Sequence, residues 1–163
     1  MRVNVLMYNQ DDPKKCTAAK LVRFNLAKKV TNISKNTLTL DPFADHTLLN
    51  SDKNKIKSIT GIDCSWSLAD QTFIKKFGGI SRKLPYLLAG NSVNFSKLGK
   101  LTTVEAIVAS LYLLGFENQA TNLLSKFKWG HTFLDLNINL LKDYQLATSE
   151  KQIEEIAKEY SLI

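Results

Sequence analysis

The chain has 163 residues, of which 44% are hydrophobic and 23% charged, and it carries a formal net charge of +7. This length allows one compact unit, or two tightly joined halves, with a substantial core. The longest apolar run, residues 106–114, is too short to cross a bilayer, and the polar N-terminal segment does not fit a signal peptide, so we expect a cytoplasmic protein.

The first half of the chain alternates short apolar runs with polar turns and helical patterns. Apolar and β-branched clusters predict strands, whereas apolar residues that recur every three or four positions predict helices. The strands expected are residues 3–8, 36–40, 58–64 and 84–89, and the helices are residues 16–29 and 66–77. A lysine-rich connection with room for a short helix covers residues 49–57.

Only helical patterns follow residue 100. Thr102 and Glu105 form a capping box before a segment that is apolar on nearly all sides, which predicts a central, buried helix at residues 103–114. Further helices are expected at residues 117–126 and 132–144. Ser149 and Gln152 then open a last helix, whose inner stripe is Ile153, Ile156, Tyr160 and Ile163. The pattern predicts an α/β fold: an N-terminal parallel β-sheet with flanking helices, and an all-helical C-terminal part.

The positive charge lies in the first half of the chain. Residues 1–83 hold fifteen Lys and Arg against seven Asp and Glu, whereas residues 84–163 hold seven against eight. A basic half indicates an anionic partner such as nucleic acid, although solvated surface lysines account for the same composition. If these side chains cluster in space, the expected RNA-binding residues are Lys14, Lys15, Lys20, Arg23, Lys28 and Lys29.

No metal site is expected. Cys16 and Cys64 do not form a CxxC pair, and two cysteines alone cannot complete a structural zinc site. His46 and His131 lie far apart and lack ligand spacing. Two reduced thiols near turns are the simplest interpretation.

Two candidate site residues follow an expected strand in the segment IDCSW. Asp63 lies where ligands of open α/β sheets gather, and its carboxylate there could accept a proton; capping the next helix is the alternative. Trp66 could form the wall of a ligand pocket or pack in the core.

Two further segments have a turn geometry that suits small ligands. Thr17 stands at the start of a helix, where free amides favour an anion, or where it serves only as a cap. In AGNSVN, Gly90 permits close backbone approach, and Asn91 and Asn94 favour a tight turn. The chain lacks both GxGxxG and GxxxxGK[ST] in these places, which disfavours ordinary Rossmann and P-loop nucleotide binding.

Six segments in this order resemble the S-adenosylmethionine-dependent aminocarboxypropyltransferases that act on small-subunit ribosomal RNA. The segments are DPKKCTAAKL (12–21), LDP (40–42), IDCSW (62–66), RKLPYLLAGNSVNF (82–95), KLTTVEA (100–106) and FKWG (127–130), with Phe133 after the last. The chain departs from the family pattern at Thr17 and Ala18, where Ser or Gly is commoner, and at AGNSVNF in place of AANPVNYG.

The resemblance implies a SPOUT-like deep trefoil knot, with an α/β domain at residues 1–85 and a helical domain at residues 86–163 that completes an S-adenosylmethionine site. By position, the adenosine pocket would include Tyr86, Leu87, Leu88, Ala89, Asn91, Leu101, Thr102 and Thr103. An apolar nook for the sulfonium methyl would consist of Leu40, Pro42 and Ala69, and the aminocarboxypropyl chain would lie among Thr17, Asp63 and Trp66.

The resemblance also implies the reaction. With the methyl group buried, attack falls on the γ-carbon of the methionine moiety, and 5′-methylthioadenosine is released. The family's acceptor is N3 of a pseudouridine, often N1-methylated, and Asp63 is the candidate base, unless it only orients the donor's amino group. The alternatives are a SPOUT-type RNA methyltransferase and a non-catalytic rRNA-binding assembly factor. A monomer is expected, although related methyltransferases often dimerise through the knot.

Overall fold

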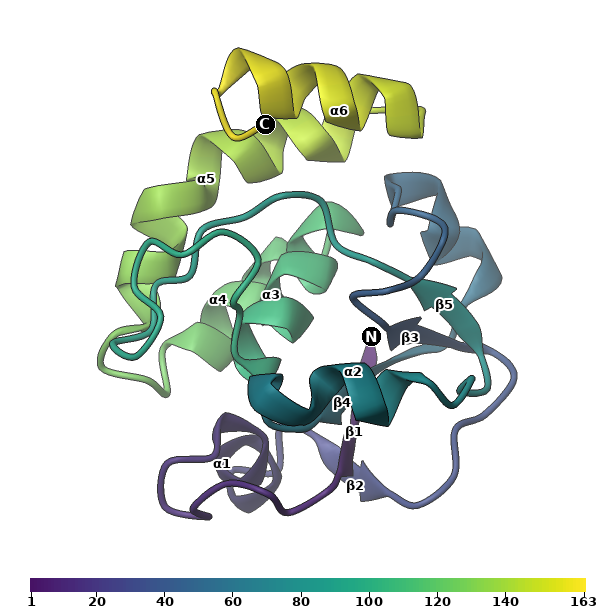
Figure 1. Cartoon of the computed structure of the whole chain (residues 1–163), viewed down its shortest axis with the longest axis vertical. Coiled ribbons are helices and arrows are strands. Elements are labelled where there is room, and N and C mark those ends of the chain that lie inside the picture. Colours follow the sequence, from purple (N-terminus) through teal and green to yellow (C-terminus); the bar gives the residue numbers. More distant parts are fainter.

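The short apolar runs of the first half form a five-stranded sheet with the order β2-β1-β4-β3-β5 (Figure 1). The computed structural model describes all 163 residues. Its strands are β1 (Arg2–Met7), β2 (Lys28–Val30), β3 (Thr37–Leu40), β4 (Ser58–Asp63) and β5 (Ile80–Arg82). All four pairings are parallel, so the carboxyl ends of the strands meet at one edge. The predicted parallel sheet is confirmed.

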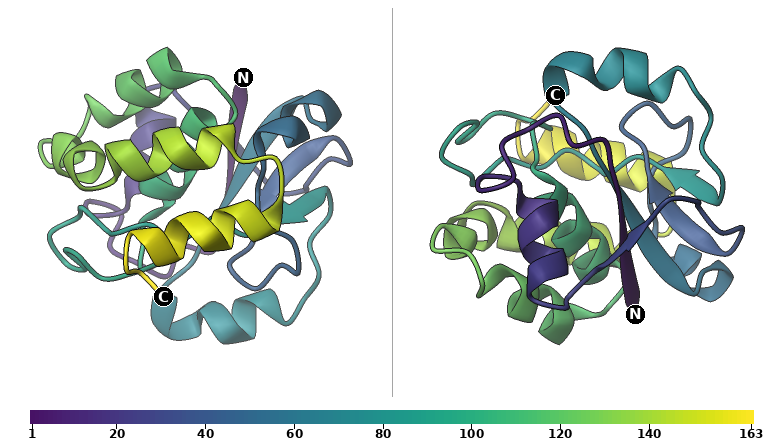
Figure 2. Two further views of the ribbon diagram at one scale, coloured as in Figure 1. Left: turned by 90° about the horizontal axis from the view of Figure 1, so that it is seen from above. Right: turned by 90° about the horizontal axis from the view of Figure 1, so that it is seen from below.

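Helices follow the strands, and from residue 103 onward the chain forms helices only, as predicted. The helical elements are α1 (Thr17–Arg23), η1 (Asn50–Lys55), η2 (Trp66–Leu68), α2 (Ala69–Phe73), α3 (Thr103–Leu113), α4 (Glu117–Leu124), α5 (Gly130–Leu146) and α6 (Glu150–Glu159). Helices α5 and α6 run side by side across one face of the molecule (Figure 2).

Helix α3 is the centre of the structure. Nine of its eleven residues are buried, and Thr102 and Glu105 form the predicted capping box at its start. Gly61 of β4 lets the helix approach the sheet, because a Cβ at this position would lie 3.0 Å from the Thr103 methyl group and 3.1 Å from Ile107. One cluster of 31 buried residues consequently runs from the sheet through α3 into the C-terminal helices.

The predicted helix at residues 16–29 is wrong in its second half. Helix α1 ends after Arg23, where Asn25 adopts a left-handed conformation with φ 55°. The amides of Asn25 and Leu26 bond back to the carbonyls of Val22 and Leu21, which is the Schellman arrangement that stops a helix. Lys28 and Lys29 therefore lie in the edge strand β2, which the sequence analysis missed.

Three other expectations fail in detail. The strand expected at residues 84–89 is a loop, and β5 precedes it. The helix expected at residues 66–77 is two short pieces, η2 and α2. In α6 the buried residues are Ile153 and Ala157, whereas Tyr160 and Ile163, which follow the end of the helix, are 38% and 51% exposed.

Candidate functional site

Asp63 lies at the carboxyl edge of the sheet, as its sequence position predicted. It is the last residue of β4 and is only 7% exposed. Its carboxylate accepts a hydrogen bond from the Thr103 hydroxyl at 2.7 Å and another from the Cys16 thiol at 3.2 Å. Because an ionised carboxylate offers about four acceptor positions, roughly two remain for a ligand.

Cys16 joins this cluster, although its sequence pattern suggested no role there. Burial and the nearby Asp63 raise the pKa of its thiol to about 11, so the thiol keeps its proton at neutral pH and donates to the carboxylate. Its sulfur also accepts from the Ala19 amide at 3.3 Å and so caps α1. Cys16 is therefore the N-cap of this helix. The alternative in which Thr17 serves only as the cap is wrong.

Thr17 instead connects two helices. Its hydroxyl accepts from the Val104 amide at 3.3 Å, one of the free amides in the first turn of α3. The beginnings of α1 and α3 therefore lie together beside Asp63. A threonine at this position can also turn its hydroxyl toward a ligand, because the Val104 bond is long and uses only the oxygen.

Trp66 stands against the segment that leads into α3. Its indole N–H donates to the Leu101 carbonyl at 2.9 Å, and Lys100 Nζ lies 4.6 Å from the ring centroid. The side chain is 36% exposed, so it is not a core residue. Trp66 and Asp63 thus contact the segment Leu101–Thr103, which was expected in the adenosine pocket, and Thr17 contacts Val104 directly after it.

The segment 86–91 is held in place from α5. The Leu88 amide donates to Asn137 Oδ1 at 2.8 Å, and Asn137 Nδ2 donates to the Leu88 carbonyl at 2.8 Å. The Tyr144 hydroxyl donates to the Tyr86 carbonyl at 3.2 Å. The backbone of Leu88 is therefore already paired, and only Tyr86, at 42% exposure, is widely open to solvent in this segment. Leu87 and Ala89 are fully buried.

Glu105 joins this segment to the start of α3. Its buried carboxylate accepts five hydrogen bonds, from the amides of Gly90, Asn91 and Thr102, the Asn91 side chain and the Thr102 hydroxyl, at 2.7–3.0 Å. The predicted cap is confirmed, but no local pattern indicated the bonds to the 86–91 segment. Gly90 permits the close approach of helix α5 as well as its own turn, because a Cβ at this position would lie 2.6 Å from the Phe133 Cα.

The three residues of the expected apolar nook differ in exposure. Leu40 and Ala69 are 7% and 3% exposed, whereas Pro42 is exposed. The loop after β3 nevertheless reaches α2, since the ring centroids of Phe43 and Phe73 are 5.8 Å apart. The two segments that carry the nook are therefore neighbours at the carboxyl edge.

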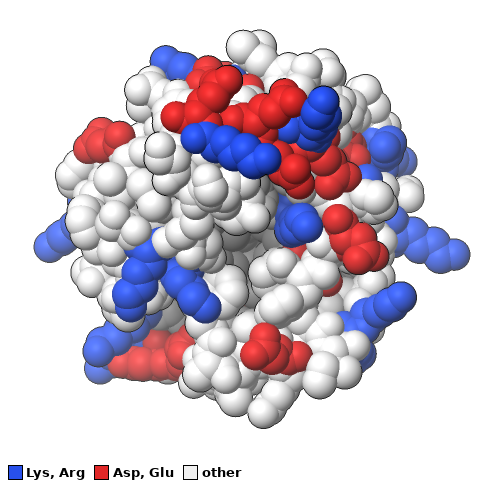
Figure 3. Space-filling view, turned by 45° about the horizontal axis from the view of Figure 1, so that its top comes forward, with Lys and Arg blue, Asp and Glu red and all other residues white.

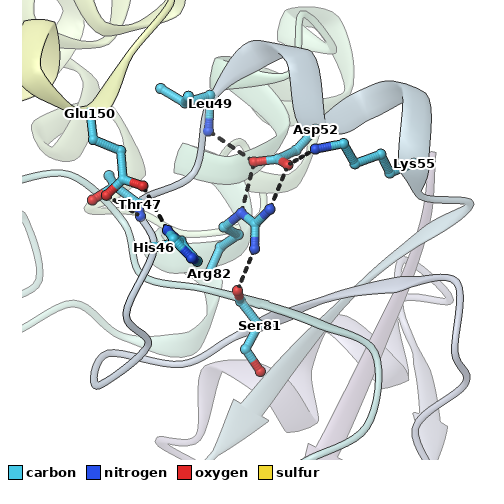
Figure 4. Close-up of polar contacts among 8 residues, drawn as sticks. All are labelled: His46, Thr47, Leu49, Asp52, Lys55, Ser81, Arg82 and Glu150. Carbon is cyan, nitrogen blue, oxygen red and sulfur yellow. Dashed lines mark hydrogen bonds and ion pairs between the residues drawn. The ribbon is translucent and has the colours of Figure 1, made fainter.

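A separate polar cluster fixes the loop between β3 and β4 (Figure 4). Arg82 makes two 3.0 Å bonds to the carboxylate of Asp52, which is 2% exposed. Burial acts to raise the pKa of Asp52, but the bonds from Arg82 and the Leu49 amide outweigh it, so the pKa is lowered. Glu150 of α6 accepts from the Thr47 amide at 3.1 Å and contacts His46 at 2.9 Å. This cluster is structural and contains none of the predicted site residues.

The predicted RNA-binding residues lie on α1, on the turn before it and on β2. All except the half-buried Lys20 are exposed, and none forms an ion pair with a carboxylate. Acidic side chains gather elsewhere, around α6 at the top of the hollowed face in Figure 3. The basic side chains are Lys14, Lys15, Lys20, Arg23, Lys28 and Lys29.

No group of three or more His, Cys, Asp or Glu side chains is arranged to hold a metal ion. None of the helices combines the length and apolar character that a transmembrane helix needs.

Two family models match the chain. Residues 38–161 match the family "Ribosome biogenesis protein, C-terminal", and residues 1–33 match "Possible Fer4-like domain in RNase L inhibitor, RLI". An iron–sulfur cluster needs about four cysteine ligands. Residues 1–33 contain only one cysteine, Cys16, and its thiol donates a hydrogen bond to Asp63. The residues present do not fit such a cluster.

Curated relatives and a solved structure match almost the whole chain. The 16S rRNA aminocarboxypropyltransferase of Methanococcoides burtonii is 44% identical, covering 97% of this chain and 94% of that protein. The protein of the same name from Saccharolobus solfataricus is 40% identical, covering 98% and 95%. The structure of the SAM-dependent rRNA:acp-transferase Tsr3 from Vulcanisaeta distributa superposes with a TM-score of 0.82 at 31% identity, covering 99% of this chain and 98% of that one.

The relatives agree with the parallel α/β fold and with the aminocarboxypropyltransferases that the sequence motifs resemble. They do not support the SPOUT-like classification expected from the sequence. Identity at this level over nearly the full length is enough to assign the family. The chain belongs to the 16S rRNA aminocarboxypropyltransferase family.

Proposed function

We propose that this enzyme transfers the 3-amino-3-carboxypropyl group of S-adenosylmethionine to N3 of a pseudouridine, N1-methylated or not, in small-subunit ribosomal RNA. The reaction would release 5′-methylthioadenosine during ribosome biogenesis. Family membership supports the reaction class. The observation that carries the site assignment is that Thr17, Asp63 and Trp66 all bond to residues 101–104 at the carboxyl edge of the sheet.

The residues at this edge suit a donor that is part nucleoside and part amino acid. Bound S-adenosylmethionine supplies a sulfonium with three activated carbons, so its orientation decides which group is transferred. Asp63 has unused acceptor positions for an ammonium group, with Thr17 and Trp66 beside it. Tyr86, Leu88 and the Leu101–Thr103 segment would form the adenosine side. The buried Leu40 and Ala69, with Pro42, would enclose the methyl group and keep it from the nucleophile.

Two roles for Asp63 fit this arrangement. Its carboxylate could take the N3 proton of the acceptor, or it could hold only the amino group of the donor. The Thr103 and Cys16 donors orient it in either case, since each bonds to a different oxygen.

The acceptor must leave its stack to reach a site at the edge of the sheet. A loop nucleotide can be splayed out at moderate cost, with the RNA backbone held by basic side chains. The basic α/β part, residues 1–85, would face the RNA, and residues 86–163 would complete the donor site. The trefoil knot, the monomeric state and the cytoplasmic location remain predictions.

The decisive experiment supplies immature small-subunit RNA with donor labelled either in the carboxyl carbon or in the methyl group. Carboxyl label in the RNA, with methylthioadenosine as co-product, is the expected result. Methyl label and S-adenosylhomocysteine would instead identify a methyltransferase. Label from neither donor, together with salt-sensitive RNA binding and no donor affinity by calorimetry, would identify an assembly factor.

A further inference from the structure

The chain contains a long segment with basic residues and no acidic ones. Between Asp12 and Asp41 there is no Asp or Glu, and the segment includes α1, β2 and the turn that joins them. Its unpaired cations are Lys14, Lys15, Lys20, Arg23, Lys28, Lys29 and Lys35. Such a surface attracts a polyanion over its whole length, because no carboxylate within it offsets the field.

The C-terminal half adds to the same surface. Lys20 Nζ lies 5.7 Å from the centroid of the Phe127 ring, which places the joint between α4 and α5 against α1. Lys126 and Lys128 flank Phe127, are exposed and form no ion pair. The basic surface therefore continues from α1 onto the joint between α4 and α5.

One aromatic side chain stands out of this surface. Phe24 is 49% exposed and is the C-cap residue of α1. The Schellman bonds of Asn25 and Leu26 fix its backbone, so the ring is presented from a rigid turn. Arg23 precedes it, and Lys28 and Lys29 follow four and five residues later. Phe24 is absent from the residues that form or pack against the core, so core packing does not account for a large apolar ring among unpaired cations.

A cavity lies directly beyond this turn. It is an open depression with a volume of about 760 Å³, and Arg2, Lys28 and Lys29 are among the residues that line it. Its walls are residues 25–30 on one side and residues 1–4 on the other, which are paired through β1 and β2. The cavity contains no acidic residue, so its polar groups favour an anion such as a phosphate.

Helix α1 connects the cavity to the candidate active site. It begins at Cys16 and Thr17, which contact Asp63 and α3, and it ends at Phe24. Seven residues of helix span about 10 Å. A single-stranded RNA that reaches Asp63 can therefore lie along α1 and contact Phe24.

We propose that Phe24 is a stacking platform for an unpaired base of the substrate RNA, and that Arg2, Lys28 and Lys29 hold the adjoining phosphates in the cavity. This inference rests on the proposed rRNA substrate. An exposed ring binds any base through its π-face, and cations on both sides of it follow the backbone, which is how single-stranded RNA is held. Duplex RNA would leave the ring without a partner, since its bases are stacked already.

The test is equilibrium binding of a fluorescently labelled single-stranded RNA, with a duplex of the same sequence as comparison. The single strand should bind about 10-fold more weakly to Phe24→Ala, and Phe24→Leu should not restore it, because stacking needs a planar ring. Phe24→Trp should keep the affinity, and its added fluorescence should be quenched by RNA. S-adenosylmethionine affinity, measured by calorimetry, should be unchanged in all three variants.

The cations are tested by salt dependence. The double variant Lys28→Gln, Lys29→Gln should lower the slope of log affinity against log salt by about 1.4, because each phosphate that is no longer neutralised on a single strand lowers it by about 0.7. The matched control is Lys142→Gln, Lys158→Gln, which removes two exposed, unpaired lysines from α5 and α6 and should leave the slope nearly unchanged.

The outcomes separate this inference from the proposed function. Equal RNA affinity of wild type and Phe24→Ala, or no RNA binding by the wild type, overturns the inference. Unquenched fluorescence of Phe24→Trp also overturns it. If label transfer to RNA proceeds normally in Phe24→Ala, the proposed function stands without the platform. If no donor group reaches the RNA but binding still depends on Phe24, the platform stands and the reaction is wrong.

Discussion

Two buried carboxylates at the start of α3 are arranged for different purposes. Glu105 accepts five hydrogen bonds, all from its own helix start and from residues 90 and 91. Asp63 accepts only two, from side chains on two other elements, and it lies at the edge of the sheet. A carboxylate offers about four acceptor positions, so Glu105 is saturated whereas Asp63 is not.

This difference separates a residue that builds the site from one that is available to a ligand. Removal of the Glu105 charge leaves buried donors unpaired, which costs stability. Replacement of Asp63 by asparagine affects only two donors and keeps an oxygen that can accept from one of them, so it should cost less stability while it changes the charge at this edge. Burial alone does not distinguish them, since Asp63 is 7% exposed and Glu105 is fully buried.

The largest effect is expected for Asp63→Asn. Transfer to RNA should fall by about 100-fold or more, because an amide neither takes a proton nor pairs with an ammonium group. The melting temperature should change little. Asp70→Asn is the matched control, since Asp70 is exposed on the nearby α2 and forms no ion pair. Normal transfer and normal donor affinity in Asp63→Asn would remove Asp63 from the site.

The reverse pattern is expected for Glu105→Gln. The amide nitrogen would face donors, so unfolding should become easier by about 2–4 kcal/mol, as measured by denaturant titration. Glu154→Gln, at an exposed position of α6, should change stability by less than about 0.5 kcal/mol. If Glu105→Gln were as stable as the wild type, the saturated carboxylate would not be what holds the 86–91 segment to α3.

The smallest effect concerns the thiol that donates to Asp63. Burial raises the pKa of Cys16 from 9.0 to about 11, so only the unfolded chain loses this proton between those values. Its contribution to stability is full below pH 9 and is lost as the pH rises toward 11. The free energy of unfolding of the wild type relative to Cys16→Ser should therefore drop by about 1 kcal/mol between about pH 8 and pH 10. A pH-independent difference would mean that the thiol titrates normally.

The regular parts of the fold could be predicted from local pattern. Strands β1, β3 and β4 and helix α3 have strong periodicity, and their ends were correct to within one or two residues. The predictions of secondary structure were wrong where a partner distant in the sequence decides the conformation. Residues 84–89 are apolar like a strand, but they form only one isolated antiparallel bridge, Leu88 with Leu98, and the polar groups of the Leu88 backbone pair with the distant Asn137 side chain, which nothing local signals. The early end of α1 had a signal in Asn25, a residue that tolerates a left-handed conformation.

The candidate site was predictable in its location but not in its connections. Ligands gather at the carboxyl ends of parallel strands, which pointed to Asp63 from the sequence. The partners of Asp63 could not be found in this way, because Cys16 and Thr103 lie 47 and 40 residues away from it in the chain. Lys28 and Lys29 are expected from the sequence on a helix, whereas they lie in strand β2, and their part in RNA binding stays a prediction.

The pairing of Asn137 with Leu88 has a consequence for how the protein matures. These residues are 49 positions apart, and both polar groups of the Leu88 backbone depend on the one side chain. In a nascent chain that has not yet released α5, Leu87 and Ala89 can pair with residues 96–99, and residues 90 and 91 can bond to Glu105, but the Leu88 N–H and C=O lack their partner. Synthesis runs from the N-terminus, so this edge is assembled last. A growing chain would therefore complete the Leu88 pairing and the core contacts of α5 in the same late step, because Phe133, Leu140 and Leu141 of that helix belong to the single core.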